Sequence, residues 1–493
     1  MGILNNNIIE QIKNVLIVVL IFTTILLLYF LWGNESIEYF IFNDDDNVSE
    51  ISCSDVMLPT EIVFGLGNED YVVVSRGREK VWNEYILNTF TKFSSNTNVL
   101  VEEITENKYR QVMEYPSIVA GFEYSMPFRE FCEANNINQP QGYDGISSIT
   151  QIAFSKGSSE SAFIHDATKD KYYRLVGNNK LSLFEEIEAS LANVDISTYY
   201  TLRTFLGEES NNQTLIPVDM PHGLVPIPYN LDLGSKEEVA TADMAKDYFG
   251  ETFDFVRKIE EANGTTIYMY GYGQKVLIIN PNDGSIEYKE DIKVPEMSQV
   301  SLFEALQNAL NFISSHGGFE TMQGQNIKTY LESVSPIDDK KGGYRFVFAL
   351  GIDGNKIFYG NHMPIIVEVV DGQVAYFRRQ LININDADLS NPKDVDLTAI
   401  NMLAMNYPYI ASALAEEGII EKEQGAALLF EDVADKIDHL TTGYYKSDIA
   451  IGEDGIVKTQ SGQLIPAWIV DVDGILFYFD LYTGAPVGHS VKY

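Results

Sequence analysis

The pattern of hydrophobic and polar positions separates one long apolar run from a much longer stretch of alternating and periodic segments. Eighteen consecutive residues from Val15 to Trp32, VLIVVLIFTTILLLYFLW, carry no charge. As a helix that rises about 1.5 Å per residue, this run would span roughly 27 Å, close to the thickness of the hydrocarbon core of a bilayer. We therefore expect a transmembrane helix over 15–32, with Tyr29 and Trp32 at the membrane interface.

The charges on the two sides of this run are unequal. Lys13 and the amino terminus precede it, offset only by Glu10, whereas residues 33–50 hold six acids and no Lys or Arg. This asymmetry predicts a cytoplasmic segment at 1–14, an acidic juxtamembrane spacer at 33–52 and an extracytoplasmic bulk. A cleaved signal peptide is the main alternative, but its apolar core usually has about 7–15 residues and precedes a small-residue cleavage site, which FLWGNESIEY lacks. We expect a single-pass protein of the cell membrane.

The segment from 53 to 215 reads as an N-terminal α+β domain. The runs TEIVFGL and DYVVVSR predict strands, and EKVWNEYILNTFTKF predicts a helix because its apolar residues recur at helical spacing. SSITQIAFSK, ESAFIHD and KYYRLV follow, and they predict neighbouring antiparallel strands joined by polar turns.

A proline-rich segment at 216–231 predicts a linker. Its four prolines lie within twelve residues: Pro217, Pro221, Pro226 and Pro228. Because proline lacks a backbone N–H and is confined to sheet edges, we expect neither a helix nor a central strand here.

Beyond this linker, a helical segment followed by aromatic and β-branched strands recurs three times. The helical segments are KEEVATADMAKDYFG, SLFEALQNALNFISSH and LTAINMLAMNYPYIASALAEEG, the last with EDVADKIDHL. The strands are punctuated by turns at Asp283-Gly284, Asp353-Gly354, Asp371-Gly372, Asp473-Gly474 and Thr483-Gly484. Such pairs tolerate the positive φ angles of tight hairpins. We predict α+β modules, a middle domain at 232–385 and a C-terminal domain at 386–493, in which helices lie across antiparallel sheets.

The alternation in AWIVDVDGILFYFDLY predicts one buried and one wetter strand face. Trp468 alternates with Val470 and Val472, so we expect it in the core of the last module.

The net charge of −37, from 71 acidic and 34 basic residues, predicts a surface that repels nucleic acid and anionic lipid headgroups. An acidic, solvated exterior explains most of this charge, and cation or cationic-peptide binding is the alternative. Cys53 and Cys132 are the only cysteines. An oxidising compartment allows a bridge between them, but two cysteines do not make a disulfide framework.

Patterns of catalytic and metal-binding residues are weak. The sequence has no HExxH, CxxC, GxSxG or phosphate-binding GxxxxGK[ST] motif. Its six histidines are not paired at metal-ligand spacing: His165, His222, His316, His362, His439 and His489. LININDADLSN at 381–391 departs from a calcium loop and lacks its glycine, so a polar loop is the better interpretation. We predict no catalytic residue, cofactor or metal site, a profile that suits a regulator better than an enzyme.

Within the apolar run, Thr23 and Thr24 are the small polar residues. Their hydroxyls can hydrogen-bond to another membrane helix, or back to their own helix. They are our candidate partner-binding residues.

The layout resembles the YycH family and its relative YycI, extracytoplasmic proteins of Gram-positive bacteria. DVMLPTEIVFGLGNEDYVVV followed by a helix with Trp82 is similar to that family's opening. PSIVAGFEYSMPFREFCE, from Pro116 to Glu133, is similar to the family's strand that leads into a proline-hydrophobic element, here Pro127, Phe128 and Phe131. KYYRL at 171–175 and the proline-rich joint fit as well. PAWI at 466–469 and Tyr482-Thr483-Gly484 are similar to YycI and the PepSY-like group. The resemblance implies control of the WalK (YycG) sensor kinase through the transmembrane helix and the outer domains.

The sequence is compatible with three functions. The favoured one is a membrane-anchored regulator of a two-component sensor histidine kinase, acting by contact, with a YycI-like protein as a further candidate partner. The second is an extracytoplasmic binding module for a cell-wall polymer, a peptide or a cation. The third is a membrane-tethered hydrolase.

Overall fold

The computed structural model describes residues 51–493 of the 493-residue chain, apart from short gaps. The gaps are 75–76, 95–98, 140–142, 178–182, 192–195, 208–209, 232–237, 294–299, 320–326, 338–341, 381, 385–388, 390–391, 422–427, 448–460 and 493. The expected membrane helix at 15–32, with Thr23 and Thr24, lies outside the described residues. Among the described residues, no helix combines the length and the apolar character that crossing a bilayer requires.

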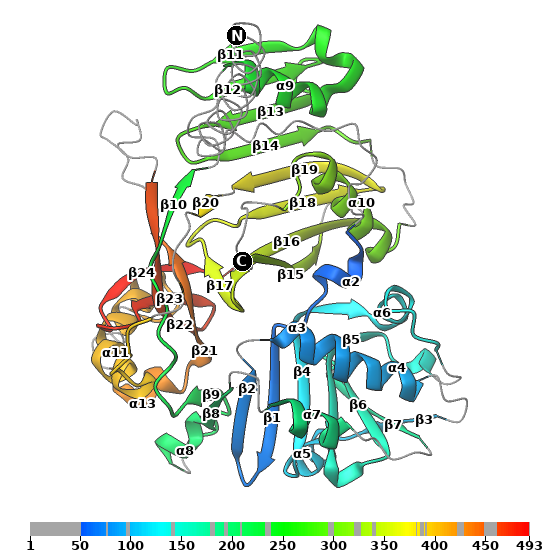
Figure 1. Ribbon diagram of the computed structural model, residues 1–493, viewed down its shortest axis with the longest axis vertical. Helices are drawn as coiled ribbons and strands as arrows, with labels where there is room; N and C mark the ends of the chain where they lie inside the picture. Colours follow the sequence, from blue (N-terminus) through cyan, green and yellow to red (C-terminus); the bar gives the residue numbers. More distant parts are fainter. Residues whose placement is uncertain are drawn as a thin grey trace, which may run out of the picture. The chain divides into compact units, whose positions relative to one another are not determined.

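The described strands form two large sheets in an α+β fold (Figure 1). The first sheet has nine strands in the order β3-β7-β6-β5-β4-β1-β2-β8-β9. These strands are β1 (Glu61–Gly67), β2 (Asp70–Val74), β3 (Leu100–Ile104), β4 (Ser117–Pro127), β5 (Ser148–Ser155), β6 (Ser161–Asp166), β7 (Lys171–Val176), β8 (Ile196–Thr201) and β9 (Leu215–Pro217). The consecutive strands β5, β6 and β7 pair antiparallel, which confirms the prediction from their sequences.

The second sheet has fifteen strands, twelve of them in the order β11-β12-β13-β14-β19-β18-β16-β17-β21-β22-β10-β20. Off this path, β15 pairs with β16, β23 with β22, and β24 with β23. The strands are β10 (Ile227–Leu231), β11 (Arg257–Glu260), β12 (Thr266–Tyr270), β13 (Lys275–Asn280), β14 (Ser285–Glu290), β15 (Ile327–Pro336), β16 (Gly343–Ile352), β17 (Asn355–Phe358), β18 (Ile365–Val370), β19 (Gln373–Gln380), β20 (Ile382–Ile384), β21 (Ile437–Lys446), β22 (Ser461–Val472), β23 (Ile475–Asp480) and β24 (Pro486–Val491). Only β17 and β21 pair in parallel among the described strands.

The helices of the described residues pack against these sheets or against one another. They are α2 (Cys53–Val56), α3 (Arg78–Lys80), α4 (Asn88–Ser94), α5 (Glu106–Met113), α6 (Phe128–Ala134), α7 (Leu183–Leu191), α8 (Leu202–Leu206), α9 (Glu238–Phe249), α10 (Leu302–Ser315), α11 (Ala399–Glu416) and α13 (Phe430–Ala434), with the π-helical segment η1 (Val81–Leu87) between α3 and α4. The predicted helix over EKVWNEYILNTFTKF is confirmed, and its apolar side packs on the first sheet. There the buried ring of Trp82 packs edge-on against that of Phe122 on β4, with the ring centroids 5.4 Å apart and the ring planes at 85°.

The repeated helix-plus-hairpin pattern is confirmed in the second sheet, except within EDVADKIDHL. This segment is helical only as far as Ala434, and its last residues, from Ile437, begin β21. Helix α9 contacts β13, α10 contacts β18 and β19, and α11 contacts β23 (Figure 1). Helix α10 begins after Ser301, whose side-chain oxygen accepts a hydrogen bond from the backbone N–H of Glu304 at 3.1 Å and so satisfies one of the donors at the helix start. Three hairpin turns have positive φ at their aspartates, 51° at Asp353, 50° at Asp371 and 48° at Asp473, as the Asp-Gly sequences predict.

The proline-rich segment connects the first sheet to the second, but it contains strand at both ends. β9 pairs with β8, and β10 lies between β22 and β20. The expectation that prolines exclude a central strand is therefore wrong for β10. Pro228 lies opposite Gln463 of β22, whereas β20 pairs only from Tyr229 onward, so the missing N–H interrupts no bond on the β20 side. The domain limits proposed from the sequence remain predictions.

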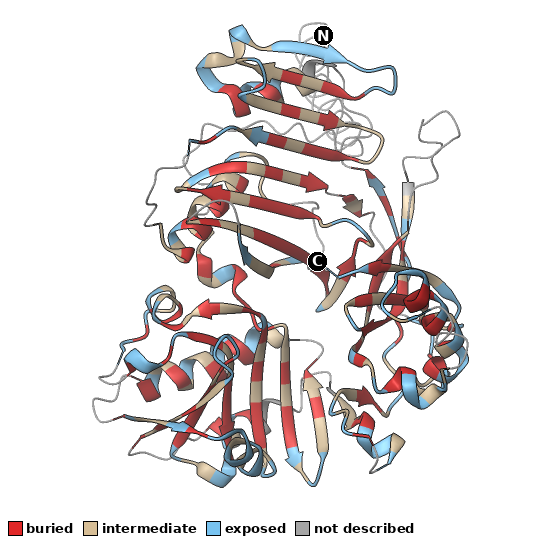
Figure 2. Ribbon diagram, turned by 180° about the vertical axis from the view of Figure 1, so that it is seen from behind, coloured by how far each residue is buried: buried red, intermediate tan, exposed pale blue. Residues whose placement is uncertain are grey.

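Strand β22 also corrects an expectation. Trp468, Val470 and Val472 are fully buried on one face, as predicted. The opposite face is buried as well, because Ala467 and Ile469 pack with Phe358, Tyr445 and Tyr478 in a separate small core. The predicted wetter face does not exist over residues 467–472 of this strand. Figure 2 shows buried residues running through the strands of both sheets.

Candidate functional site

The described residues contain no group of three or more His, Cys, Asp or Glu side chains arranged to hold a metal ion. Of the 381–391 loop, residues 382–384 form β20 and most of the remainder lies outside the described residues. Cys53 and Cys132 are free, buried thiols. Burial raises the pKa of Cys53 to about 11 and that of Cys132 to about 12, so neither thiol is ionised at neutral pH.

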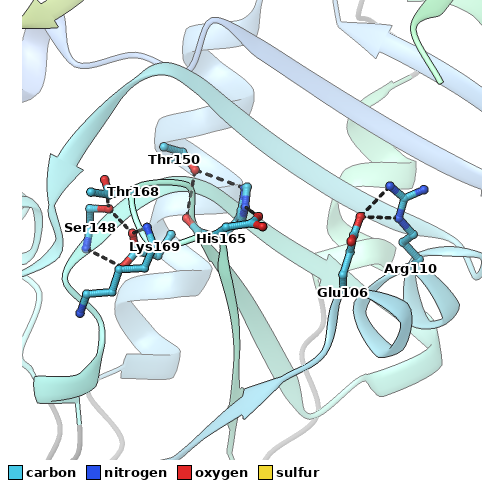
Figure 3. Close-up of polar contacts among 9 residues, drawn as sticks. Glu106, Arg110, Ser148, Thr150, His165, Thr168 and Lys169 are labelled. Atoms are coloured by element: carbon cyan, nitrogen blue, oxygen red, sulfur yellow. Dashed lines mark hydrogen bonds and ion pairs between the residues drawn. The ribbon is translucent and has the colours of Figure 1, made fainter. Parts of the chain in front are cut away.

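A dense polar network lies where β5 begins and β6 ends (Figure 3). The buried carboxylate of Asp166 accepts hydrogen bonds from the hydroxyl of Ser147 at 2.5 Å and from the hydroxyl of Ser148. The backbone N–H groups of Ser147, Ser148 and Lys169 also donate to it, each at 3.2 Å. Burial alone would raise the pKa of Asp166, but these donors stabilise the ionised form and hold its pKa below the usual value.

His165 lies beside this network without forming a catalytic pair. Its ring stacks on Tyr172 at 4.4 Å, and Nδ1 lies 3.4 Å from the hydroxyl of Thr150. Burial lowers the pKa of His165 and outweighs the opposite effect of Asp170, so the ring is neutral at pH 7. The Ser148 hydroxyl donates to the carboxylate of Asp166, whose lowered pKa makes it a weak general base. The arrangement in Figure 3 therefore ties β5 to the turn after β6, and it supplies no activated nucleophile.

A second group of contacts joins helix α10 to the start of the described chain and to α6. We call Ile51, Cys53, Glu130, Phe303 and Gln307 the α10 junction. The side-chain amide of Gln307 donates to the carbonyl of Ile51 at 3.0 Å, and the Cys53 thiol donates to the carbonyl of Phe303 at 3.7 Å. The backbone N–H of Phe303, in the first turn of α10, donates to the carboxylate of Glu130 at 2.9 Å. Helix α10 of the second sheet thus holds both α2 and the first-sheet helix α6.

A third group, which we call the charged cluster, includes charged side chains of β4, β15 and β17 and of other elements. We define it as Arg78, Glu123, Glu332, Lys356, Asp471 and Lys492. Lys356 forms a close ion pair with Glu332, with side chains 22% and 13% exposed. Lys492 pairs with the buried Asp471 at 2.7 Å. Burial would lower the pKa of Lys356, but the nearby carboxylate of Glu332 raises it above the usual value.

Glu123 occupies a distinct position in this cluster. Among the described residues, no hydrogen bond or ion pair reaches its carboxylate. The surrounding protein would raise the pKa of Glu123, but four nearby basic groups lower it: Lys356, Lys492, His439 and Arg78. The negative charge of Glu123, on β4 of the first sheet, therefore attracts basic residues of the second sheet without a hydrogen bond or ion pair. Such an arrangement suits contact between charged surfaces.

The comparisons with known proteins concern the fold. No protein-family model and no curated protein matches this sequence. The solved structure of YycH from Bacillus subtilis matches with a TM-score of 0.51 at 10% sequence identity, covering 89% of this chain and 98% of that one. The C-terminal domain of YpeB from Bacillus megaterium covers 52% of this chain and 98% of that one, with a TM-score of 0.26 and 12% identity. The chain thus has a YycH-like fold.

Apart from Cys53, the residues of the α10 junction and the charged cluster were not singled out from the sequence. Glu130 and Phe303 are 173 positions apart, and no local pattern marks a carboxylate that will reach a distant helix start. Thr23 and Thr24, the predicted partner-binding residues, lie outside the described residues, so their role stays a prediction.

Proposed function

We propose that this protein is a membrane-anchored, extracytoplasmic regulator of a two-component sensor histidine kinase. The observation that carries the proposal is the YycH-like fold, which extends over 89% of the chain. The two segments that most resemble the YycH family, 55–74 and 116–133, also form neighbouring structure, since β1 pairs with β4 from Glu61–Gly121 to Gly65–Ser117. Regulation by contact requires no cofactor and no catalytic step.

The anchor would act together with the outer domains. Thr23 and Thr24 sit near the middle of the expected helix 15–32, where an interhelical hydrogen bond is worth about 0.6 kcal/mol on average. The segment that follows residue 50 is held on α10 by Gln307 and Cys53. The kinase would be contacted in the membrane and outside it.

The test has two steps in cells. Photocrosslinking from positions within 15–32, followed by identification of the captured protein, should yield a sensor histidine kinase, with or without a YycI-like protein. Replacing 15–32 with an unrelated anchor should then impair control of the output of that kinase, and Thr23→Val with Thr24→Val should impair it in part. Thr23→Ser with Thr24→Ser is the matched control, because it keeps both hydroxyls. Capture of no kinase from the helix or from outer-domain positions would refute the proposal.

The proposed topology has a separate test. Asp45→Cys should react with a membrane-impermeant thiol reagent in intact cells. The native thiols Cys53 and Cys132 give little background, because both are buried and have raised pKa values. Labelling only after lysis would place the bulk of the chain inside and contradict an extracytoplasmic regulator.

A further inference from the structure

The second sheet ends on a strand whose sequence is complementary to itself. In the described part of the sheet, β11 pairs with β12 alone, so its other side forms the sheet edge (Figure 1). All four residues of β11 are exposed, in contrast to the buried positions of the strands further inside (Figure 2). An exposed edge strand is a template for pairing with another chain. The sequence from 257 to 261 is Arg-Lys-Ile-Glu-Glu, with two bases, an apolar centre and two acids.

We propose that β11 pairs antiparallel with β11 of a second copy of this chain, about a two-fold axis at Ile259. In this register Arg257 lies opposite Glu261 of the second copy, Lys258 lies opposite Glu260, and Ile259 lies opposite its own counterpart. Lys258 and Glu260 already pair within one strand at 2.6 Å, so the new charged contact is that of Arg257 with Glu261, which occurs twice because of the symmetry. Opposite charges placed directly across a strand pair stabilise it, and like charges destabilise it.

The backbone of β11 is oriented for this pairing. The N–H of Glu261 donates to the carbonyl of Thr265 at 2.9 Å, and its carbonyl accepts from the N–H of Gly264 at 3.0 Å, so residue 261 faces β12. Backbone groups of alternate residues point to opposite sides of a strand, so those of Lys258 and Glu260 point away from β12. In the proposed register these two residues lie opposite each other and can exchange both N–H···O bonds.

The charges also select one register. An antiparallel pair with a two-fold axis can instead centre on Lys258, and the same backbone groups would face each other. That register places Lys258 opposite Lys258 and Arg257 opposite Ile259, which brings like charges together. Of the two registers, only the one centred on Ile259 places Arg257 opposite an acid; Lys258 already pairs with Glu260 of its own strand at 2.6 Å and does not decide between them. The pairing is also locally neutral, so the net charge of −37 opposes it only over distances that salt screens, with a Debye length of about 8 Å at physiological ionic strength.

The apolar side chains give a second, independent argument. Ile259 lies opposite Ile267 of β12, which lies opposite Ile278 of β13. Ile259 is 46% exposed, and the other two are half-buried on the face opposite the buried Tyr268 and Leu277. Each copy therefore contributes a row of three isoleucines. Pairing of two copies about Ile259 would join the two rows into one stripe of six and cover Ile259, the most exposed of the three, in each copy. This self-association is independent of the proposed control of a kinase.

Charge reversal with differently tagged full-length chains in detergent tests the pairing. Wild-type chains should co-purify, whereas Arg257→Glu alone and Glu261→Arg alone should each weaken the dimer about tenfold or more, since either places like charges at two symmetric contacts. Mixing the two variants should restore association, because the reversed residues are complementary in the mixed pair. Wild-type chains that stay monomeric, or a dimer that neither reversal weakens, would overturn the proposal.

Disulfide trapping tests the position of the axis. Ile259→Cys places a thiol opposite its own counterpart, so mild oxidation of the full-length chain should give a reducible dimer. Leu66→Cys is the matched control, because Leu66 is a comparably exposed apolar residue, 54% exposed, in the first sheet. Equal crosslinking of the two variants would show random collision and refute the axis at Ile259.

Discussion

The carboxylate of Glu130 on α6 accepts a hydrogen bond from the backbone N–H of Phe303, in the first turn of α10, at 2.9 Å. The first N–H groups of a helix have no partner within it, so this contact satisfies a donor that water would otherwise meet. Because α6 packs against the first sheet and α10 against the second, one side chain joins the two parts of the protein.

We expect Glu130→Ala to lower the free energy of unfolding by about 1 kcal/mol, the usual cost of losing a helix cap. Glu130→Gln keeps an acceptor oxygen and should lose less. Thermal unfolding of the full-length protein, compared with Glu133→Ala on the same helix, measures the effect. Equal melting temperatures for Glu130→Ala and Glu133→Ala would contradict a capping role.

Trp468→Ala should be among the most damaging single changes in the second sheet. Its side chain is fully buried, and truncating such a residue costs about 3–5 kcal/mol. The indole N–H has no hydrogen-bond partner among the described residues, so Trp468→Phe removes no bond and should cost clearly less. A melting temperature unchanged by Trp468→Ala would show that the residue is not in the core.

Lys356→Met should destabilise the protein by about 3–5 kcal/mol, because it leaves the largely buried carboxylate of Glu332 without its partner. Adding Glu332→Leu should recover most of the loss, since an apolar pair of similar size tolerates burial. Lys289→Met is the control, because the pair of Lys289 with Glu287 is more exposed and is worth about 0–1 kcal/mol. If the double variant is no more stable than Lys356→Met, the ion pair is not the cause.

Asp166 should make stability depend on pH in acid. Its pKa is lower in the folded protein than in the unfolded chain, where it is about 3.9, so the ionised carboxylate stabilises the fold above that value. This contribution is lost as the pH falls through the lower, folded-state pKa. We expect Asp166→Asn to melt well below wild type at pH 6, with the difference shrinking toward pH 2. A difference that stays constant with pH would contradict the effect.

The sequence by itself determined the local structure of this protein. The helix start at Ser301, the turns at Asp353, Asp371 and Asp473, and the buried row of Trp468 follow from periodicity, capping and turn chemistry. These depend on residues at most four positions apart, so the pattern along the chain contains the information they need.

Only the tertiary structure decided which distant surfaces meet. It placed Pro228 in a strand between two partners, buried both faces of β22 and brought Glu123 near Lys356 and Lys492. Each outcome depends on the register and neighbours of strands that lie far apart in the sequence. A strand's own alternation shows that its two faces differ, but the element that covers the second face decides whether that face is wet. The charge pattern of 257–261 is likewise visible in the sequence, but it points to pairing with a second chain only because β11 lies at a sheet edge.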